Sequence, residues 1–401
     1  MRCGAMVELK NISFRYGSEN TVSKYADCLR NINLTVKTGE FILLTGPSGC
    51  GKTTILRIIN GLIPQFYPGE VTGEIFIDGE SVKEHELYDT ALIIGTVFQN
   101  PRTQFYNVDT TGELAFGCEN RGLSKQEIYA RIDSTVADFH MGVLMDRSIF
   151  RLSDGEKQKI ACASVNVSEP KIILLDEPSA NLDYDSTLML RKLILRWKSE
   201  GKTIIAAEHR IAYLWDIIDR AVIMQNGEII REFTEDEKDM LTQNDLQKMG
   251  LRTTVMESPV DIQMEAFQDG DSPITLRNFH FTYRGEKKNI VDIPMLKIAA
   301  GQISAIAGAN GAGKTSFLNC LCGLEKHCKG TLEYKGKIYD GRSRQKLCFM
   351  VMQDTGNQLF TESVLDEVLI SLKKGVGNEN EKAIETPTRS EERRVGKECR
   401  S

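Results

Sequence analysis

The sequence predicts an α/β fold that occurs twice in the chain, with the second copy incomplete. The first observation is a continuous apolar run at residues 41–44, which leads into the glycine-rich loop GPSGCGKTT and then into a helical pattern. Such a run is typical of a strand buried on both faces of a parallel sheet. The second observation is that the same series of motifs begins again near residue 276.

The repeat sets the domain organisation. Three segments recur in the same order: LKNISFRY as LRNFHFTY, GPSGCGKTT as GANGAGKTS, and VFQNPRTQF as VMQDTGNQL. The period is too long for a solenoid, so we interpret it as domain duplication. We expect a first domain at 6–251, a polar, acidic linker at 252–272, and the N-terminal part of a second domain at 273–388. Apolar residues within 240–249 predict a closing helix for the first domain.

Composition excludes several classes of protein. The chain has 401 residues, of which 41% are hydrophobic, and a net charge of −6, so no nucleic-acid-binding surface is expected. No stretch of about 18 apolar residues is present, so no transmembrane segment is expected. The ten cysteines lack metal-ligand spacing and favour reduced thiols in the cytosol.

The two glycine-rich loops are typical of phosphate binding. Glycines let the backbone N–H groups face phosphate oxygens, the lysine contacts the β- and γ-phosphates, and the next hydroxyl binds Mg²⁺. In the first copy the candidate nucleotide-binding residues are Gly46, Ser48, Gly49, Cys50, Gly51, Lys52, Thr53 and Thr54. In the second they are Gly308, Asn310, Gly311, Ala312, Gly313, Lys314, Thr315 and Ser316, with Thr315 as a metal ligand.

Two later strand ends carry candidate catalytic groups. KIILLDEP predicts a buried strand that ends in Asp176, a candidate Mg²⁺ ligand, and Glu177, a candidate base for the attacking water. The alternative is an acidic strand end that caps the next helix. TIIAAEHR predicts a third buried strand that ends in His209, for which a γ-phosphate contact is expected.

These motifs resemble those of ATP-binding-cassette ATPases. The glycine loop, Gln99, LSDGEKQ at 152–158, Asp176-Glu177, SANLD and His209 stand in that family's order. The resemblance implies a P-loop NTPase fold of the ATP-binding-cassette type with antiparallel β and helical subdomains, and ATP and Mg²⁺ as cofactors. It implies that Gln99 and Gln353 bind Mg²⁺, and that Ser153 and Gly155 cover a γ-phosphate bound by a second cassette domain, in cis or in trans. Tyr16 and Tyr283 would stack on adenine, although a core tyrosine remains the alternative.

The signature departs from the usual Leu-Ser-Gly-Gly-Gln. Asp154 stands where the first glycine is expected, and Glu156 replaces the glutamine. A carboxylate is favourable in the first turn of a helix, but near a γ-phosphate it is repulsive unless it turns away. We therefore expect Asp154 to affect the catalytic efficiency of the ATP site to which this signature contributes.

The run Gln99-Asn-Pro-x-x-Gln104 resembles one branch of the family, the energy-coupling-factor ATPases. The resemblance implies ATP-driven uptake of vitamins or metal ions from the cytoplasmic face of the membrane. The implied partners are a membrane scaffold subunit, whose coupling helix binds the helical subdomain at about 100–165, and a substrate-binding membrane subunit. The alternatives are a tandem sugar-importer ATPase, a soluble translation factor, or a catalytically incomplete nucleotide-binding fragment.

The second copy lacks several motifs of the first. The offsets of Ser153 and His209 from Gly46, applied to Gly308, fall beyond residue 401. RSEERRVGKECRS at 389–401 has no counterpart in the first copy and, as far as Cys399, matches the translation of a common sequencing adapter. We therefore expect a non-native tail and a truncated second domain, and consider Met6 the true start.

Weak ATPase activity that rises steeply with chain concentration is expected. Complete sites would form only when the first copies of two separate chains pair with each other.

Overall fold

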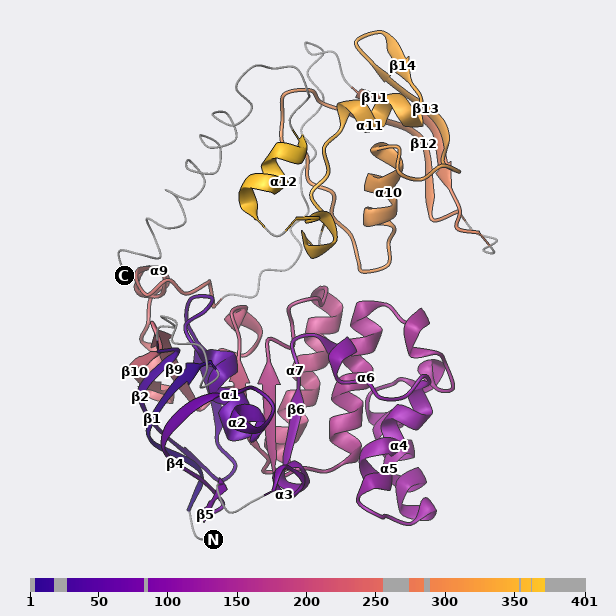
Figure 1. Cartoon of the computed structure of the whole chain (residues 1–401). Helices are drawn as coiled ribbons and strands as arrows, with labels where there is room; N and C mark the ends of the chain where they lie inside the picture. Colours follow the sequence, from indigo (N-terminus) through magenta and orange to yellow (C-terminus); the bar gives the residue numbers. More distant parts are fainter. Residues whose placement is uncertain are drawn as a thin grey trace. The chain divides into compact units, whose positions relative to one another are not determined.

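The computed structural model describes residues 4–17, 27–82, 86–254, 274–284, 289–352, 355–361 and 363–371 (Figure 1). The chain forms two compact units, with the main division after residue 265, and each unit is described by itself. Most of the expected linker and the whole of the tail expected at 389–401 lie outside the described residues.

The first unit begins with an antiparallel sheet. Its strand order is β2 (Leu29–Lys37), β1 (Ala5–Tyr16), β4 (Gly69–Ile77) and β5 (Glu80–Ser81). Apolar residues of β1 and β2 stand opposite each other, as in the pairs Leu9–Leu34 and Ile12–Ile32. Both pairs are buried, so one face of this sheet packs into the interior.

The main sheet of the first unit has six strands. Their order is β10 (Glu228–Thr234), β9 (Arg220–Gln225), β3 (Phe41–Thr45), β8 (Thr203–Ala207), β7 (Ile172–Asp176) and β6 (Ile94–Val97), parallel except for the β10–β9 pair. Every residue of β3, β7 and β8 is buried, as the apolar runs predicted. The carboxyl ends of these strands meet at one edge, which is where a ligand site forms in such sheets.

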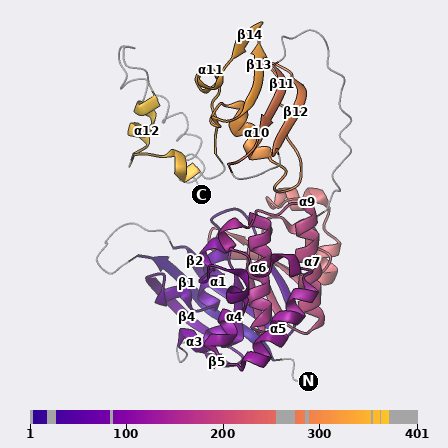
Figure 2. The same cartoon turned by 90° about the vertical axis from the view of Figure 1, so that its right-hand side faces the viewer.

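Helices cover both faces of the main sheet (Figures 1 and 2). One hydrophobic core joins the antiparallel sheet, α1 (Lys52–Ile59) and one face of the main sheet, with α2 (Leu62–Gln65) beside α1 and α3 (Leu87–Ile93) beside β6. A second core joins the other face to α4 (Thr110–Asn120), α5 (Lys125–Asp138), α6 (Asp154–Val167) and α7 (Tyr184–Ser199). The helices α4, α5 and α6 occupy the region expected to form a helical subdomain.

The first unit closes with two short helices where one was predicted. These are α8 (Glu235–Asp239) and α9 (Gln243–Lys248). Thr234 and Thr242 are each the N-cap of a capping box. The second capping box begins a new helix at residue 243, so α8 does not continue into α9. Leu246 is buried, but Met240 is exposed because it lies in the break between the helices.

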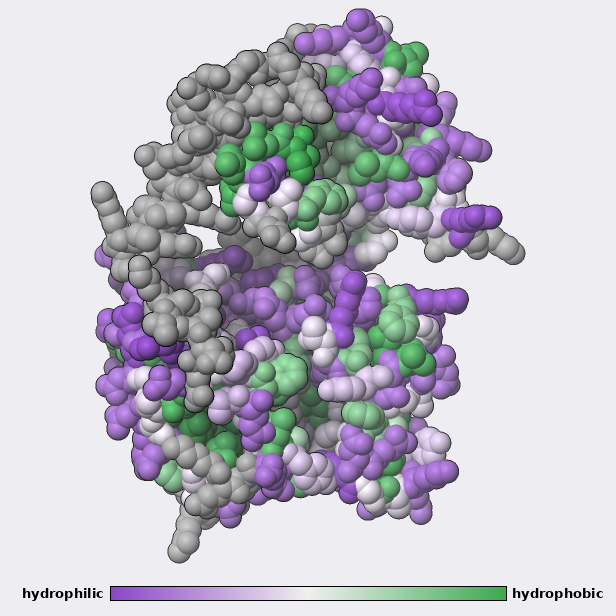
Figure 3. Space-filling model, viewed as in Figure 1, coloured by the Kyte–Doolittle hydropathy of each residue, from purple (hydrophilic) through white to green (hydrophobic). Residues whose placement is uncertain are grey.

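The second unit repeats the antiparallel sheet of the first. Its strand order is β12 (Val291–Ile298), β11 (Ile274–Phe281), β13 (Lys329–Tyr334) and β14 (Lys337–Tyr339). This sheet packs on α10 (Lys314–Leu321) through a core that includes Leu276, Phe279 and Phe317. The helices α11 (Gly341–Leu347) and α12 (Val364–Ser371) follow, and Figure 3 shows the hydrophobic surface of α12, where Val364, Leu365 and Ile370 are exposed.

The counterpart of β3 in the second unit forms no strand. Residues 303–307 precede the second glycine loop, and within the described part of this unit no strand pairs with them. Ile303 and Ile306 are exposed, as are Phe349 and Val351 at the counterpart of β6. In the first unit β3 depends on hydrogen bonds from β8 and β9 on its two sides.

Candidate functional site

The first glycine loop connects β3 to α1. Gly46 and Gly51 have φ values of 148° and 103°. A Cβ atom at Gly46 would collide with the carbonyl oxygen of Met224, and one at Gly51 would collide with the side chain of Leu29, so neither position accepts a side chain. Lys52 is buried, and its Nζ donates to the carbonyl oxygens of Gly46 and Pro47 at 3.0 Å each. The loop therefore brings an ammonium group and the free N–H groups of a helix N-terminus together.

Thr53 and Asp176 supply two adjacent oxygens at the strand edge. The Thr53 hydroxyl donates to Asp176 Oδ1 at 2.8 Å. Burial raises the pKa of the Asp176 carboxyl, and the nearby charge of Glu177 raises it further. Mg²⁺ in nucleotide sites takes one or two carboxylates together with substrate phosphates, so this donor set fits that ion.

The raised pKa of Asp176 leads to a stability prediction. A folded-state pKa above the ordinary value of an aspartate carboxyl means that ionisation of Asp176 costs folding free energy at neutral pH. Asparagine keeps the acceptor for Thr53 without the charge. We expect Asp176→Asn to raise the melting temperature in magnesium-free neutral buffer, by about 2–4 °C for each 1 kcal/mol of folding free energy recovered.

Differential scanning fluorimetry at decreasing pH tests this prediction. The difference should shrink as pH falls through the folded-state pKa, because the wild-type carboxyl is then neutral as well. An Asp176→Asn variant that melts below the wild type in neutral buffer would contradict it.

Glu177 lies at the centre of a polar cluster. Its Oε2 accepts a hydrogen bond from Gln99 Nε2 at 2.8 Å, and its Oε1 lies 3.1 Å from His209 Nε2. The hydrogen bond with His209 lowers the pKa of the Glu177 carboxyl. His209 Nε2 also lies 3.5 Å from the Ser48 hydroxyl of the glycine loop. The structure thus brings together four of the predicted site residues from three separate strand ends and the glycine loop.

Glu208 is a part of the site that sequence reasoning missed. Its buried carboxylate accepts five hydrogen bonds, from the backbone N–H and hydroxyl of Ser179, the backbone N–H groups of His209 and Arg210, and the hydroxyl of Tyr213. These bonds tie the strand end that carries His209 to the loop that follows Glu177. The sequence did contain a signal for Glu208, because it stands directly after a predicted buried apolar run. A carboxylate that is buried needs hydrogen-bond partners.

The two tyrosines have equivalent contacts in the two units. The Tyr16 hydroxyl lies 3.3 Å from Thr54 Oγ1, and the Tyr283 hydroxyl lies 3.0 Å from Ser316 Oγ. Each ring also makes an edge contact with the aromatic residue two positions earlier, Phe14 or Phe281. Both tyrosines are incompletely buried, so part of each residue is exposed beside its glycine loop.

The signature segment forms the N-terminus of α6. Ser153 is the N-cap, and its side chain and that of Glu156 form a capping box in which Glu156 Oε2 accepts from the Ser153 backbone N–H at 2.8 Å. The unexpected glutamate therefore stabilises this helix start. Asp154 pairs with Arg102 at 3.2 Å and with Lys157 at 3.5 Å, so two cations offset its charge.

The Arg102–Asp154 pair leads to a second prediction. Removal of Arg102 leaves the Asp154 charge less compensated near the phosphate that this helix end is expected to cover. We expect Arg102→Ala to lower the ATPase rate by about two- to fivefold, the range for an exposed ion pair.

A double-mutant cycle with Asp154→Gly, measured by phosphate release, tests this coupling. The second substitution should restore the rate lost in Arg102→Ala, and Arg147→Ala, which removes an exposed arginine elsewhere in the helical subdomain, should have little effect. Additive losses in the double variant would contradict the coupling.

The second unit supplies part of an equivalent site. α10 begins at Lys314 after Gly313, which has a φ of 87°, and Thr315 follows in its first turn. Gln353, the expected metal ligand of this copy, lies outside the described residues. The described second unit therefore places Lys314 and Thr315 together in the first turn of α10, whereas residues 308–311 of the loop group with the first unit, as do the predicted catalytic groups Glu177 and His209.

The fold and the site define an ATP-binding-cassette ATPase. The sequence profile of the ABC transporter family matches residues 29–180 and 291–397. A putative ABC transporter ATP-binding protein of Treponema denticola is 41% identical over 375 residues, which cover 92% of this chain and 75% of the relative. The chain belongs to the ABC transporter family, and its cassette binds and hydrolyses ATP.

Solved structures of cassettes agree with this assignment. The cbiO1 protein of Clostridium perfringens, described as part of the ABC transporter complex cbiONQ, has a TM-score of 0.52 and 27% identity, with 61% of this chain and 93% of that chain covered. A dimeric ATP-binding cassette in a post-hydrolysis state with ADP and Pi has a TM-score of 0.50 and 28% identity, with 57% and 99% covered. Both coverages exceed half of this chain, so the likeness extends over a whole cassette. No helix in the described ranges is long and apolar enough to cross a bilayer.

Proposed function

We propose that the chain is the ATP-hydrolysing subunit of an importer of the energy-coupling-factor type, which takes up a vitamin or a metal ion. In this proposal it binds peripherally at the cytoplasmic face of the membrane, beside a scaffold subunit and a substrate-binding subunit. The first cassette occupies 6–251, and the segment 273–388 belongs to a second cassette. Support comes from the Gln99–Gln104 run and from the likeness to cbiO1, which is itself part of a transporter complex.

One observation carries the proposal. The segment that holds Gln99 beside Glu177 also holds Gln104 against α6, where Gln104 Nε2 donates to the carbonyl oxygen of Ala161 at 3.2 Å. Gln104 Oε1 accepts from the backbone N–H of Phe98 at 3.3 Å, and the Asn100 side chain caps the short helix Pro101–Thr103. One short, internally bonded loop thus joins Glu177 to the helical subdomain, and we expect it to carry changes at the site to that subdomain.

The proposed roles follow from the cluster geometry. Lys52 binds the β- and γ-phosphates, and the N-terminus of α1 offers them its N–H groups. Glu177 takes a proton from the attacking water while Gln99 and His209 hold its two oxygens in place. Thr53, Asp176 and Gln99 would hold Mg²⁺, which would neutralise part of the phosphate charge. Ser153 presents the end of α6 to the γ-phosphate of a second cassette, in cis or in trans.

An exposed apolar patch on the helical subdomain supports a membrane partner. Tyr106, Val108 and Phe150 are 78%, 65% and 78% exposed. The backbone N–H of Ile149 donates to the Val108 carbonyl at 3.0 Å, which brings the segments that carry Val108 and Phe150 together, and Tyr106 stacks on Phe116 with ring centroids 5.0 Å apart. We assign this patch to the coupling helix of the scaffold, because an apolar helix surface would cover it.

Co-purification tests the proposal. The chain is expressed with the membrane proteins encoded by its neighbouring genes and captured in detergent. We expect a stable complex that is lost in Tyr106→Glu/Phe150→Glu but kept in Tyr129→Glu, which alters an exposed tyrosine on α5. The ATPase rate of the free chain should not change in either variant. Failure to capture a membrane partner, or equal capture of both variants, would overturn the assignment.

A further inference from the structure

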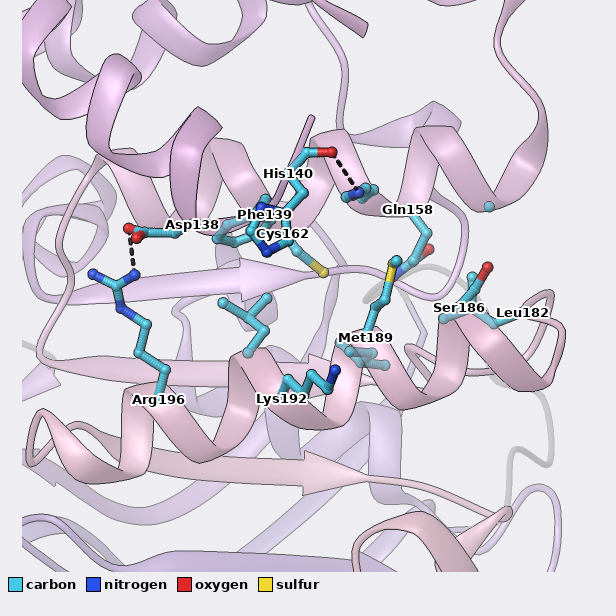
Figure 4. A pocket seen from close by; sticks show the side chains of 14 residues that line it. Asp138, Phe139, His140, Gln158, Cys162, Leu182, Ser186, Met189, Lys192 and Arg196 are labelled. Atoms are coloured by element: carbon cyan, nitrogen blue, oxygen red, sulfur yellow. Dashed lines mark hydrogen bonds and ion pairs between the residues drawn. The ribbon is translucent and has the colours of Figure 1, made fainter. Parts of the chain in front are cut away.

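A cavity of about 190 Å³ lies between α6 and α7, beside the C-terminal end of α5 (Figure 4). It is separate from the Glu177 cluster, and no residue of the proposed ATPase mechanism other than Gly155 lines it. Much of its wall is apolar and buried, with side chains from Phe139, Cys162, Leu182 and Leu190. A wall of this kind suits the hydrocarbon part of a small molecule.

Gln158 gives this cavity an unsatisfied donor. Its side chain lines the cavity and is only 4% exposed, and its Nε2 has no hydrogen-bond partner in the described structure. Buried amide groups are nearly always paired, because an unpaired donor loses its hydration without compensation. The cavity therefore lacks an acceptor at this position.

The charged groups of the cavity are predominantly positive. Arg196 is neutralised by ion pairs with Asp138 and Glu200. Lys159 Nζ donates to the carbonyl oxygen of His140 at 3.4 Å and also feels the charge of Glu156, and Lys192 stands across the cavity on α7 (Figure 4). Burial lowers the pKa of the Lys159 ammonium group, and an anion in the cavity would favour its charged form.

We propose that the cavity binds a small amphipathic carboxylate. Its apolar chain packs against Phe139 and Leu190, and its carboxylate accepts from the Gln158 amide and pairs with Lys159 or Lys192. A bound molecule would brace α6 against α7. Because α6 begins at Ser153 and Gly155 lines the cavity, occupancy would also alter how the signature segment is held.

Saturation-transfer NMR of the full chain with octanoate tests the proposal, with octylammonium as a matched ligand of opposite charge. We expect octanoate to bind and octylammonium to bind at least about tenfold more weakly, because the cavity carries positive charge. Met189→Trp fills the mouth of the cavity and should weaken octanoate binding at least about tenfold. Met240→Trp, a substitution at another exposed methionine, should have no effect.

A second variant guards against misfolding. Gln158→Leu removes the unsatisfied donor, so it should weaken octanoate binding while the thermal melt stays at or above that of the wild type. The proposal is overturned if octanoate does not bind up to its solubility limit, or if octylammonium binds equally well. Octanoate binding that survives both Met189→Trp and Gln158→Leu would also overturn it.

Discussion

Lys52→Ala is expected to weaken ATP binding at the first glycine loop by at least roughly tenfold. The buried ammonium group of Lys52 lies at the mouth of the loop, where it donates to two backbone carbonyls and is placed to contact phosphate. A charge-assisted hydrogen bond of this kind contributes about 1.5–3 kcal/mol, so its loss weakens binding by roughly 10- to 150-fold.

Isothermal titration calorimetry in a Lys314→Ala background isolates the first loop, because the second glycine loop is then disabled as well. Lys125→Ala, which alters an exposed lysine at the start of α5, is the matched control and should bind ATP normally. Unchanged affinity in the Lys52→Ala/Lys314→Ala double variant would defeat the assignment of both loops.

Glu177→Gln is expected to stop turnover while ATP binding persists. The amide cannot take a proton from water, and general-base catalysis contributes about 10²- to 10⁴-fold in rate. Glutamine can still contact Gln99 and His209, so the geometry of the cluster should survive. Phosphate release over a range of chain concentrations, with calorimetry beside it, separates loss of chemistry from loss of binding or assembly.

The control for Glu177→Gln is Glu119→Gln, an exposed carboxylate on α4. The pH dependence adds a second measurement. The hydrogen bond with His209 lowers the pKa of Glu177 below its ordinary value, so this carboxylate stays ionised into mildly acidic solution. His209→Ala should raise that pKa and move the acid limb of the rate profile upward. Wild-type turnover in Glu177→Gln would place the base elsewhere.

Local patterns predicted the central sheet and the glycine loop. The runs at β3, β7 and β8 are apolar throughout because each strand is covered on both faces, and this requirement is visible in five consecutive residues. The glycines of the first loop were equally predictable from the sequence, since few other residues adopt their positive φ values.

Contacts between distant residues were not predictable in the same way. Arg102 and Asp154 are 52 positions apart, and only the packing of the helical subdomain brings them together. Glu208 is unremarkable as a lone carboxylate, and its importance depends on donors from Ser179 and Tyr213 that tertiary structure supplies. The break between α8 and α9 was missed because local capping at Thr242 prevailed over the apolar spacing.

The pairing of β3 has a consequence for the order of folding during synthesis. The antiparallel sheet and α10 of the second unit have a shared core even though residues 303–307 form no strand beside them. Strand β3 pairs only with β8 and β9, which follow it in the chain by more than half the length of the first unit. Closing such a long loop is entropically costly and slow. On the ribosome, the antiparallel sheet of the first unit can therefore form early. The first glycine loop takes its shape only after Met224 has been made, because Gly46 packs against that residue.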